Sequence, residues 1–538
     1  MQQSKRIAML LALTALAIGL GILVFADSAK ALPPSTITVI GTDKYPKDVR
    51  AVQKAVDTYD IVKLSGRFNF GQATLEFDPD TGEYIGTPAG MVSIRRENVT
   101  LEADATGATI SGGGAPIYAP PNPYTWTWWM TLPAIAVYAP GVTVRGLTME
   151  GSIDGIFVSA AAGTPSASGP TTIENNFVHP QAWGIFVVGT PGAQSAPNAP
   201  VVIEGNVVTT PDIAFYSILT GGWPLVVRNN TLTAGGAGVV PDWAGYALDQ
   251  NMELVQALTP VDIVNNNITV GNKLQFDGIC VMGWVVWDDN ENPPPADWGD
   301  NGPVNITGNT VTMNNLWGTA ISIGRSAQGL NHCFVANNTI KGHSGDGIDK
   351  WPYGHDNWIL ENDLSGLTSE YQQIGVLAGG TIVRQNVLGI ALLPPPLLFF
   401  SVNIHPPFTP MPLPLQNCSV VDNEYRGTGC SGWSQDNGCI LLASDVDLGW
   451  NTGEGTEVRN NLVSEIGRFP QGTGGPSNQV LEIKIGPNPL VHDNRIVGLP
   501  ANFISDPSIG QRLKNARLHF AEERTKLDLR RAMRGPKR

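Results

Sequence analysis

Apolar and polar residues along this chain follow one short pattern: an apolar residue, two variable residues, Asn, one variable residue and a second apolar residue. An example is Ile173-Glu-Asn-Asn176-Phe-Val178. The asparagines of its eleven copies are Asn176, Asn206, Asn230, Asn266, Asn309, Asn338, Asn362, Asn386, Asn423, Asn461 and Asn494. They are never closer than 24 residues, and the excess varies. This spacing indicates a repeated unit into which loops of different length are inserted.

A second pattern lies between these copies: a turn, a glycine, and then Ile or Val followed by alternating apolar residues, as in Asp154-Gly155-Ile156. Each unit thus holds two or three strands of about four residues. No helix-sized segment separates the strands, which excludes a sheet built from β-α-β units. The two patterns predict an all-β solenoid, in which each strand pairs in parallel with its copy in the next coil and successive coils rise about 4.8 Å.

The repeated asparagines are expected at a tight turn between two strands, where Asn tolerates the left-handed backbone conformation. Stacked on its copies, each side-chain amide would hydrogen-bond along the rod. This role is structural, so the asparagines are not candidates for catalysis.

Both ends of the solenoid should be covered, because an open coil exposes strand edges and core. A helix is predicted at about 46–59, since Val49, Val52, Ala55 and Val56 share one helical face. At the other end, 506–538 is predicted to form a basic helical tail. It either caps the last coil or tethers the rod to an acidic partner.

Residues 1–31 have the layout of a secretory signal peptide. Lys5 and Arg6 precede an apolar run from Ile7 to Phe25, and Ala29-Lys-Ala31 fits a cleavage site. The expected location is therefore secreted, periplasmic or cell-surface. The alternative is an uncleaved membrane anchor, because the run is long enough to span a bilayer.

Composition excludes two broad classes. Hydrophobic residues make up 42% of the 538 residues and charged residues 15%, which is not the composition of a disordered chain. The net charge of −14 argues against a nucleic-acid partner. No cysteine pair has Cys-x-x-Cys spacing, so no structural metal is expected. Cys430 and Cys439 could close a small disulfide ring.

The predicted helix, then Ile61-Val-Lys-Leu-Ser-Gly-Arg-Phe68, then the asparagine repeats resemble the right-handed parallel β-helix superfamily. This pectin-lyase-like group includes many secreted right-handed β-helix repeat proteins. The resemblance covers about residues 40–505. It implies an all-β, single-stranded right-handed parallel β-helix over 32–505, with an N-terminal helical cap and a C-terminal helical tail.

The same superfamily includes lyases, hydrolases, epimerases, adhesins and accessory proteins, so the fold alone does not select an activity. Within residues 40–505 the chain lacks the strand Asp-Asp, Gly-His-Gly and Arg-x-Lys motifs of polygalacturonase-like enzymes. It also lacks the Asp-Pro-His-Asp/Glu motif of mannuronan epimerases.

Acids and imidazoles are densest in 341–363. The candidate catalytic residues are Asp346, Asp349, His355 and Asp277. Asp277 and Asp346 hold the same place before Gly-Ile two coils apart, hence about 10 Å from each other. Such a pair could supply an acid and a base for glycosidic cleavage, with a spacing that suits inversion better than retention. The alternative is turn chemistry repeated by each coil, since Asp154 also precedes Gly-Ile.

Aromatic residues in loops are candidates for binding sugar rings, because an exposed indole offers a flat apolar face. These candidates are Trp126, Trp128, Trp129, Trp284, Trp287, Trp351 and Tyr353. The alternative is that they fold back and cover the coils. The acidic loop 288–300 could hold a Ca²⁺ ion through oxygen ligands, and no other cofactor is expected.

The segment 391–415 is rich in Pro, Leu and Phe. Proline blocks a regular helix or sheet, and so many exposed apolar side chains would form an adhesive patch. We expect this insertion to pack on the rod, or to bind a partner or a second copy of the chain in a homo-oligomer.

The function favoured by these observations is that of a secreted carbohydrate-active protein, which binds a polysaccharide or glycoconjugate and cleaves it as a hydrolase or lyase. One alternative is a non-catalytic cell-surface scaffold or adhesin. Another is a periplasmic accessory protein of the copper-maturation type, which would need grouped His or Met ligands, whereas the seven histidines are scattered.

Overall fold

The computed structural model describes most of the chain between residues 33 and 504. The described residues are 33–77, 84–118, 130–159, 169–188, 199–218, 224–242, 246–248, 254–256, 260–271, 277–282, 303–325, 330–350, 356–370, 372–376, 380–391, 397–400, 417–425, 440–443, 457–463, 479–483, 490–493, 495–496, 499–500 and 502–504. The predicted signal peptide and the basic tail lie outside them. Within these ranges no helix has the length and apolarity needed to cross a membrane.

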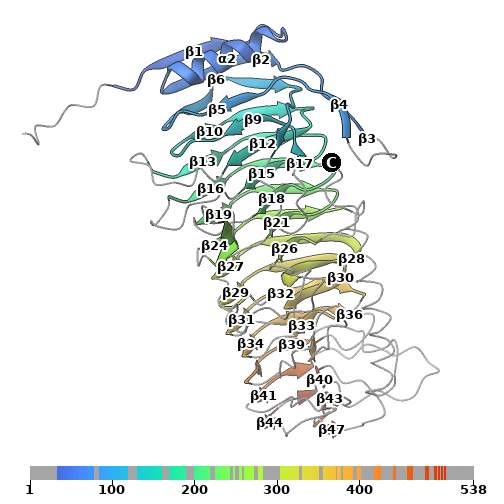
Figure 1. Ribbon diagram of the computed structural model, residues 1–538. Coiled ribbons are helices and arrows are strands. Elements are labelled where there is room, and N and C mark those ends of the chain that lie inside the picture. The colour runs from blue at the N-terminus through green and yellow to red at the C-terminus, as the bar shows by residue number, and fades with distance from the viewer. Residues whose placement is uncertain are drawn as a thin grey trace, which may run out of the picture.

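The chain winds through three parallel stacks of strands, here called sheets 1, 2 and 3 (Figure 1). One coil consists of β13 (Thr171–Glu174) in sheet 1, β14 (Phe177–His179) in sheet 2 and β15 (Ile185–Val188) in sheet 3. Each pairs in parallel with its equivalent in the next coil, with Ile173 opposite Ile203, Val178 opposite Val208 and Ile185 opposite Phe215. This winding is the right-handed parallel β-helix that the sequence implies.

The strands of each sheet follow the chain in order. Sheet 1 contains β10 (Thr143–Arg145), β13, β16 (Val201–Glu204), β19 (Leu225–Arg228), β24 (Val261–Val264), β27 (Val304–Thr307), β29 (Cys333–Ala336), β31 (Asn357–Leu360), β34 (Thr381–Arg384), β38 (Ser419–Val421), β41 (Glu457–Arg459) and β44 (Leu490–His492). Sheet 2 contains β11 (Leu147–Glu150), β14, β17 (Val207–Thr210), β20 (Thr231–Ala234), β25 (Asn267–Val270), β32 (Asp363–Ser369), β35 (Val387–Leu388), β39 (Glu424–Tyr425), β42 (Leu462–Val463) and β45 (Arg495–Ile496).

Sheet 3 contains β5 (Val92–Ile94), β9 (Pro133–Val137), β12 (Asp154–Ser159), β15, β18 (Phe215–Ile218), β21 (Val239–Asp242), β26 (Ile279–Met282), β33 (Ile374–Val376), β37 (Leu397–Phe400), β40 (Ile440–Ala443), β43 (Gln479–Ile483) and β47 (Asn502–Ile504). The long strands β28 (Thr310–Arg325) and β30 (Thr339–Lys350) turn a corner and serve both sheet 2 and sheet 3. At the start of the rod, β1 (Thr36–Ile40), β2 (Ile61–Asn69) and β6 (Thr100–Ser111) form the first coils.

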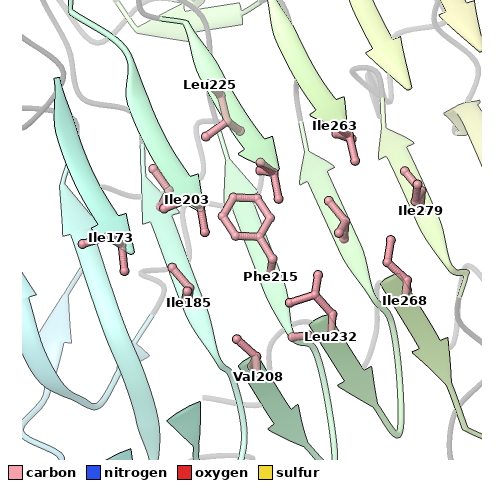
Figure 2. Close-up of a cluster of buried hydrophobic side chains, with 14 of the residues drawn as sticks. Ile173, Ile185, Ile203, Val208, Phe215, Leu225, Leu232, Ile263, Ile268 and Ile279 are labelled. Carbon is pink, nitrogen blue, oxygen red and sulfur yellow. The ribbon is translucent and has the colours of Figure 1, made fainter. Parts of the chain in front are cut away.

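The core runs along the inside of the rod. Alternating side chains of all three sheets point into it, as Ile203, Val208 and Phe215 do in Figure 2. One continuous cluster of buried apolar residues extends from Val52 to Val458. Short strands suffice because each coil buries its apolar face against the coils on both sides.

The predicted asparagine ladder is present at the corner between sheets 1 and 2. Ten of the asparagines lie among the described residues, and the nine from Asn176 to Asn423 each donate from Nδ2 to Oδ1 of the next at 2.9–3.0 Å. Each Nδ2 also donates to a carbonyl of sheet 1, as Asn266 does to Val227 at 2.9 Å. Asn494 lies outside the described residues.

The expectation that the ladder asparagines adopt the left-handed conformation is wrong. The residue before each of them does so, with φ of 55° at Asn265, 67° at Gly308 and 54° at Glu361. The left-handed residue turns the chain outward and leaves the next side chain pointing inward, where its amide reaches the neighbouring coils. This explains why many copies read Asn-Asn or Gly-Asn.

A helix lies where one was predicted, as α2 (Lys47–Thr58). It packs against β1, β2 and β5 at one end of the rod, and Val52, Ala55 and Val56 belong to the core (Figure 1). Asp48 is buried and accepts hydrogen bonds from backbone nitrogens of Thr42, Lys44 and Asn69 at 2.9–3.0 Å. The role of α2 as a cap remains a prediction.

Part of the segment expected to be an insertion belongs to the rod. Leu397–Phe400 forms β37, which pairs in parallel with β33 and β40 in sheet 3. Pro394, Pro395 and Pro396 precede the strand and the other prolines of the segment follow it in the sequence, so none interrupts its ladder. Residues 401–416 lie outside the described residues, so the prediction of an oligomer contact there stays open.

The Asn266→Ala variant tests the ladder. It removes the acceptor of the Asn230 backbone nitrogen at 3.0 Å and of Asn230 Nδ2 at 2.9 Å, and it leaves the Val227 carbonyl without its amide donor. Because these groups are buried, we expect the free energy of unfolding to fall by about 3–6 kcal/mol in urea titrations. The control is Asn267→Ala, an exposed neighbour, which should change it by less than about 0.5 kcal/mol. Equal effects of the two variants would contradict a stabilising ladder.

Candidate functional site on sheet 3

One row of outward-facing side chains of sheet 3 is here called the outer row. They alternate with inward residues such as Ile156, Ile185 and Ile348. The row consists of Phe157, Phe186, Tyr216, Val240, Cys280, Ser322, Asp349 and Gly375. Its side chains change from aromatic near the start of the rod to small and polar farther along. All of them from Phe157 to Asp349 are buried, with at most 5% of their surface exposed.

The first half of the outer row is an aromatic ladder. The ring centroids of Phe157 and Phe186 are 5.8 Å apart, and those of Phe186 and Tyr216 are 5.3 Å apart. Trp183, at the turn before β15, stacks on Tyr216 at 5.6 Å with an interplanar angle of 28°. The Tyr216 hydroxyl donates to Asp242 Oδ2 at 2.7 Å. Burial and the nearby Asp242 carboxylate hold the pKa of Tyr216 well above its ordinary value.

Trp183 also joins two carboxyl groups from different coils. Its backbone nitrogen donates to Asp154 Oδ1 at 3.0 Å, and its indole Nε1 donates to Asp212 Oδ2 at 3.1 Å. Asp154 is fully enclosed and accepts two further bonds, from Thr131 Oγ1 and from the Leu132 backbone nitrogen, both at 2.7 Å. Burial raises the pKa of Asp154, although all three of these bonds oppose that shift.

Asp212 is only partly buried and titrates in an unusual range. Burial raises its pKa from the ordinary 3.8 to about 6, and the Asp154 carboxylate adds to the shift. The hydrogen bond from Trp183 lowers it and is outweighed. A carboxyl group with such a pKa near neutral pH is suited to proton transfer.

Asp277, Thr319 and Asp346 form a column where successive coils enter sheet 3. The Thr319 backbone nitrogen donates to Asp277 Oδ1 at 2.8 Å, and Thr319 Oγ1 lies 3.5 Å from Asp346 Oδ2. Thr319 is also the strand partner of Asp346, so Asp277 and Asp346 are two coils apart, as the sequence predicts. Both are buried, with 1% of their surface exposed.

Asp154 and Asp277 have the same structural role in their coils. Each accepts a hydrogen bond from the backbone nitrogen of the equivalent residue in the next coil, which is Trp183 for Asp154 and Thr319 for Asp277. This geometry favours the structural interpretation of an Asp before Gly-Ile. A catalytic role for Asp277 and Asp346 remains a prediction.

Asp349 lies on the outer row, as the alternation around Ile348 predicts. Gln372 Nε2 donates to its Oδ1 at 3.1 Å. A Cβ atom at Gly375, on the next coil, would lie 2.6 Å from the same oxygen, so only glycine accommodates this carboxylate. Its strand partner on the other side, Ser322, is fully buried, and its hydroxyl has no hydrogen-bond partner within the described ranges.

Lys350, the next residue, points the other way. It occupies the inward row between Ile323 and Val376 and is fully buried. Burial lowers the pKa of Lys350 to about 8 and raises that of the nearby Cys333 thiol to about 12. This lysine therefore belongs to the core and not to the outer row.

The remaining predicted site residues lie outside the described residues. They are His355, Trp126, Trp128, Trp129, Trp284, Trp287, Trp351 and Tyr353. The acidic loop 288–300 is also outside. In the part of the chain that is described, no group of three or more His, Cys, Asp or Glu side chains could hold a metal ion.

Sequence reasoning missed Trp183 and Asp212. The available signal was their place in equivalent turns of consecutive coils, Gln181-Ala-Trp183 before Gly184 and Pro211-Asp212 before Ile213. What brings them together is the stacking of those turns, which the sequence pattern does not show residue by residue.

No protein-family model matches the chain. No curated protein matches its sequence either.

Three solved structures resemble the chain at 12–13% identity. One is the A-module of the Azotobacter vinelandii mannuronan C-5 epimerase AlgE4, with 13% identity, a TM-score of 0.36 and coverage of 70% of this chain and 91% of that one. A family 28 exopolygalacturonase of Yersinia enterocolitica has 12% identity, a TM-score of 0.33 and coverage of 88% and 78%. The DFA-IIIase of Arthrobacter chlorophenolicus A6 has 12% identity, a TM-score of 0.25 and coverage of 84% and 87%. At these identities and TM-scores, no residue of this chain can be assigned a role from the three structures.

The raised pKa of Asp212 makes the stability of the protein pH-dependent. The folded chain holds this proton up to about pH 6, whereas an ordinary Asp releases it near 3.8. Stability is therefore lost as the pH rises from about 4 to 6, by on the order of 1–3 kcal/mol. The Asp212→Asn variant should gain that amount over the wild type between pH 4 and pH 7, measured from urea midpoints. The exposed control Glu361→Gln should show no such gain. A pH-independent difference for Asp212→Asn would refute the assignment.

Proposed function

We propose that this protein is carbohydrate-active, binds a neutral polysaccharide along sheet 3 and acts on it through Asp349. The observation that carries the proposal is the outward placement of this carboxylate beside the Ser322 hydroxyl, with Gln372 holding one of its oxygens. Asp349 and Ser322 expose only 4% and 0% of their surface, so this part of the row must be uncovered when the ligand binds. Carboxylate, amide and hydroxyl groups side by side are what sugar hydroxyls bind.

Acidic groups elsewhere along sheet 3 bear on the charge of the ligand. The aromatic ladder from Phe157 to Tyr216 lies four or more coils from Asp349, and its rings are at most 4% exposed, so it supports the fold and does not present a sugar-stacking surface. Asp154, Asp212, Asp242 and Asp277 add carboxyl groups to this side of the rod. Together with the net charge of −14, they disfavour a polyanionic glycan unless Ca²⁺ bridges it.

The reaction would be hydrolysis of a glycosidic bond, in which an acid protonates the leaving oxygen while a base takes a proton from the water whose oxygen bonds to the anomeric carbon. Asp349 would act as the acid or base, and its counterpart would come from Asp346, Asp277 or His355. Asp277 and Asp346 lie two coils apart, about 10 Å, a separation nearer to that of inverting than of retaining hydrolases. A lyase would use the same carboxylate to abstract a proton beside an acidic group of the substrate, which the charge of the chain disfavours.

A non-catalytic scaffold or adhesin is the second candidate. It is favoured by the structural use of Asp154 and Asp277, which serve the backbone of the next coil. In that case glycan binding would occur without turnover.

A panel of neutral and acidic polysaccharides tests the proposal, with reducing ends and unsaturated products measured separately. We expect cleavage of a neutral glycan, and a loss of roughly 100-fold or more in kcat for Asp349→Asn with binding retained. His355→Ala tests the counterpart, and the exposed Asp363→Asn serves as the matched control. Binding without cleavage would select the scaffold. If the wild type neither binds nor cleaves any glycan, the proposal is wrong.

A further inference from the structure

Strand β28 carries two extra residues at the corner between sheets 2 and 3. Asn315 pairs with Ser344 of β30, and Thr319 pairs with Asp346. Leu316, Trp317 and Gly318 thus lie opposite Gly345 alone. Such bulges re-aim side chains and are frequent beside functional sites.

The two side chains at this bulge, Leu316 and Trp317, are apolar and exposed. Trp317 exposes 56% of its surface and Leu316 exposes 40%. The other large exposed apolar residues among the described ranges stand singly, at Ile40, Tyr45 and Phe177. An exposed Trp forgoes the burial that would favour folding, so the position calls for a reason other than folding.

The turn that carries Trp317 is held in place. The Trp317 backbone nitrogen donates to Asn315 Oδ1 at 3.1 Å. Gly345 of the next coil lies so close that an added Cβ atom would be 3.2 Å from the Trp317 carbonyl carbon and 3.3 Å from the Leu316 oxygen. The indole is therefore presented on a fixed backbone, which limits the ordering entropy that a ligand would have to overcome.

Polar groups that bind hydroxyls surround this corner. Thr319, two residues after Trp317, contacts Asp277 and Asp346. Asn314 is exposed and is the strand partner of His343 in β30. His343 Nε2 lies 2.9 Å from Glu370 Oε1 of the following coil. In Figure 1, β28 and β30 lie side by side in the rod.

We propose that Trp317 is the stacking platform for one ring of a neutral glycan, with Asn314, His343 and Glu370 binding hydroxyl groups of that ring or the next. This inference rests on the proposed function and adds a subsite at the edge of sheet 3 where Asp277 and Asp346 lie. A flat apolar face, with an amide three residues away on the same strand and an imidazole and a carboxylate on the following coils, suits a sugar ring, which has apolar faces and a polar edge.

The test compares Trp317→Ala, Trp317→Phe and Phe177→Ala by isothermal titration with the neutral polysaccharide that the wild type binds in the panel. Phe177, on β14 in sheet 2, is an exposed aromatic residue at a different place on the rod. We expect a roughly tenfold weaker affinity for Trp317→Ala, which corresponds to a lost stacking energy of about 1.4 kcal/mol. Trp317→Phe should lose less than about threefold because its ring also stacks, and Phe177→Ala should bind as the wild type does.

The outcomes separate this inference from the proposed function. If the wild type binds a glycan and Trp317→Ala binds it equally well, the platform is wrong while the proposed function stands. If the wild type binds none, the proposed function fails and the platform fails with it. Sedimentation of the wild type and of Trp317→Ala tests whether a second copy of the chain covers Trp317 instead of a glycan. A wild-type dimer that Trp317→Ala converts to a monomer would overturn the subsite in favour of a contact between copies.

Discussion

The structure depends on the hydrogen bonds that join one asparagine amide to the next along the rod. Each of the ten described amides donates to a backbone carbonyl of sheet 1, and its oxygen accepts from the preceding coil, as the bonds of Asn266 show, so these buried groups have partners. Because side chains alternate with a period of two, a slip of one residue would move the apolar residues of a strand out of the core. The ladder thereby fixes the register of every coil, even where loops change the distance in sequence from 24 to 43 residues.

Because the register is fixed, residues that are distant in the sequence lie next to one another in rows across the coils. Phe157, Phe186 and Tyr216 become an aromatic ladder, and Ser322, Asp349 and Gly375 become strand partners, although each pair is separated by an entire coil. The rod can therefore change its outer chemistry step by step without disturbing the core. In sheet 3 this change runs from aromatic to small polar residues, and the candidate site lies at the polar end.

The carboxylates along sheet 3 do not all have the same role. Asp154 and Asp277 receive backbone nitrogens from the next coil, and such bonds hold the turn in place. Asp349 is as buried as Asp154 but accepts its hydrogen bond from the Gln372 side chain, and Asp212 is partly exposed with a pKa of about 6. Their partners, and not their burial alone, distinguish carboxylates that hold the backbone of the next coil from carboxylates that could serve a ligand.

The sequence by itself determined the coil, the ladder, the inward Ile348 with the outward Asp349, and the two-coil relation between Asp277 and Asp346. These follow from local alternation and from the repeat, which are properties of neighbouring residues. Only the tertiary structure decided which residue takes the left-handed turn, that β37 joins sheet 3, that Trp183 joins Asp154 to Asp212, and that Trp317 is turned outward. Each of these depends on which residues of one coil lie against which of the next. That stacking is decided by how many residues each loop and corner inserts, and no local pattern records it.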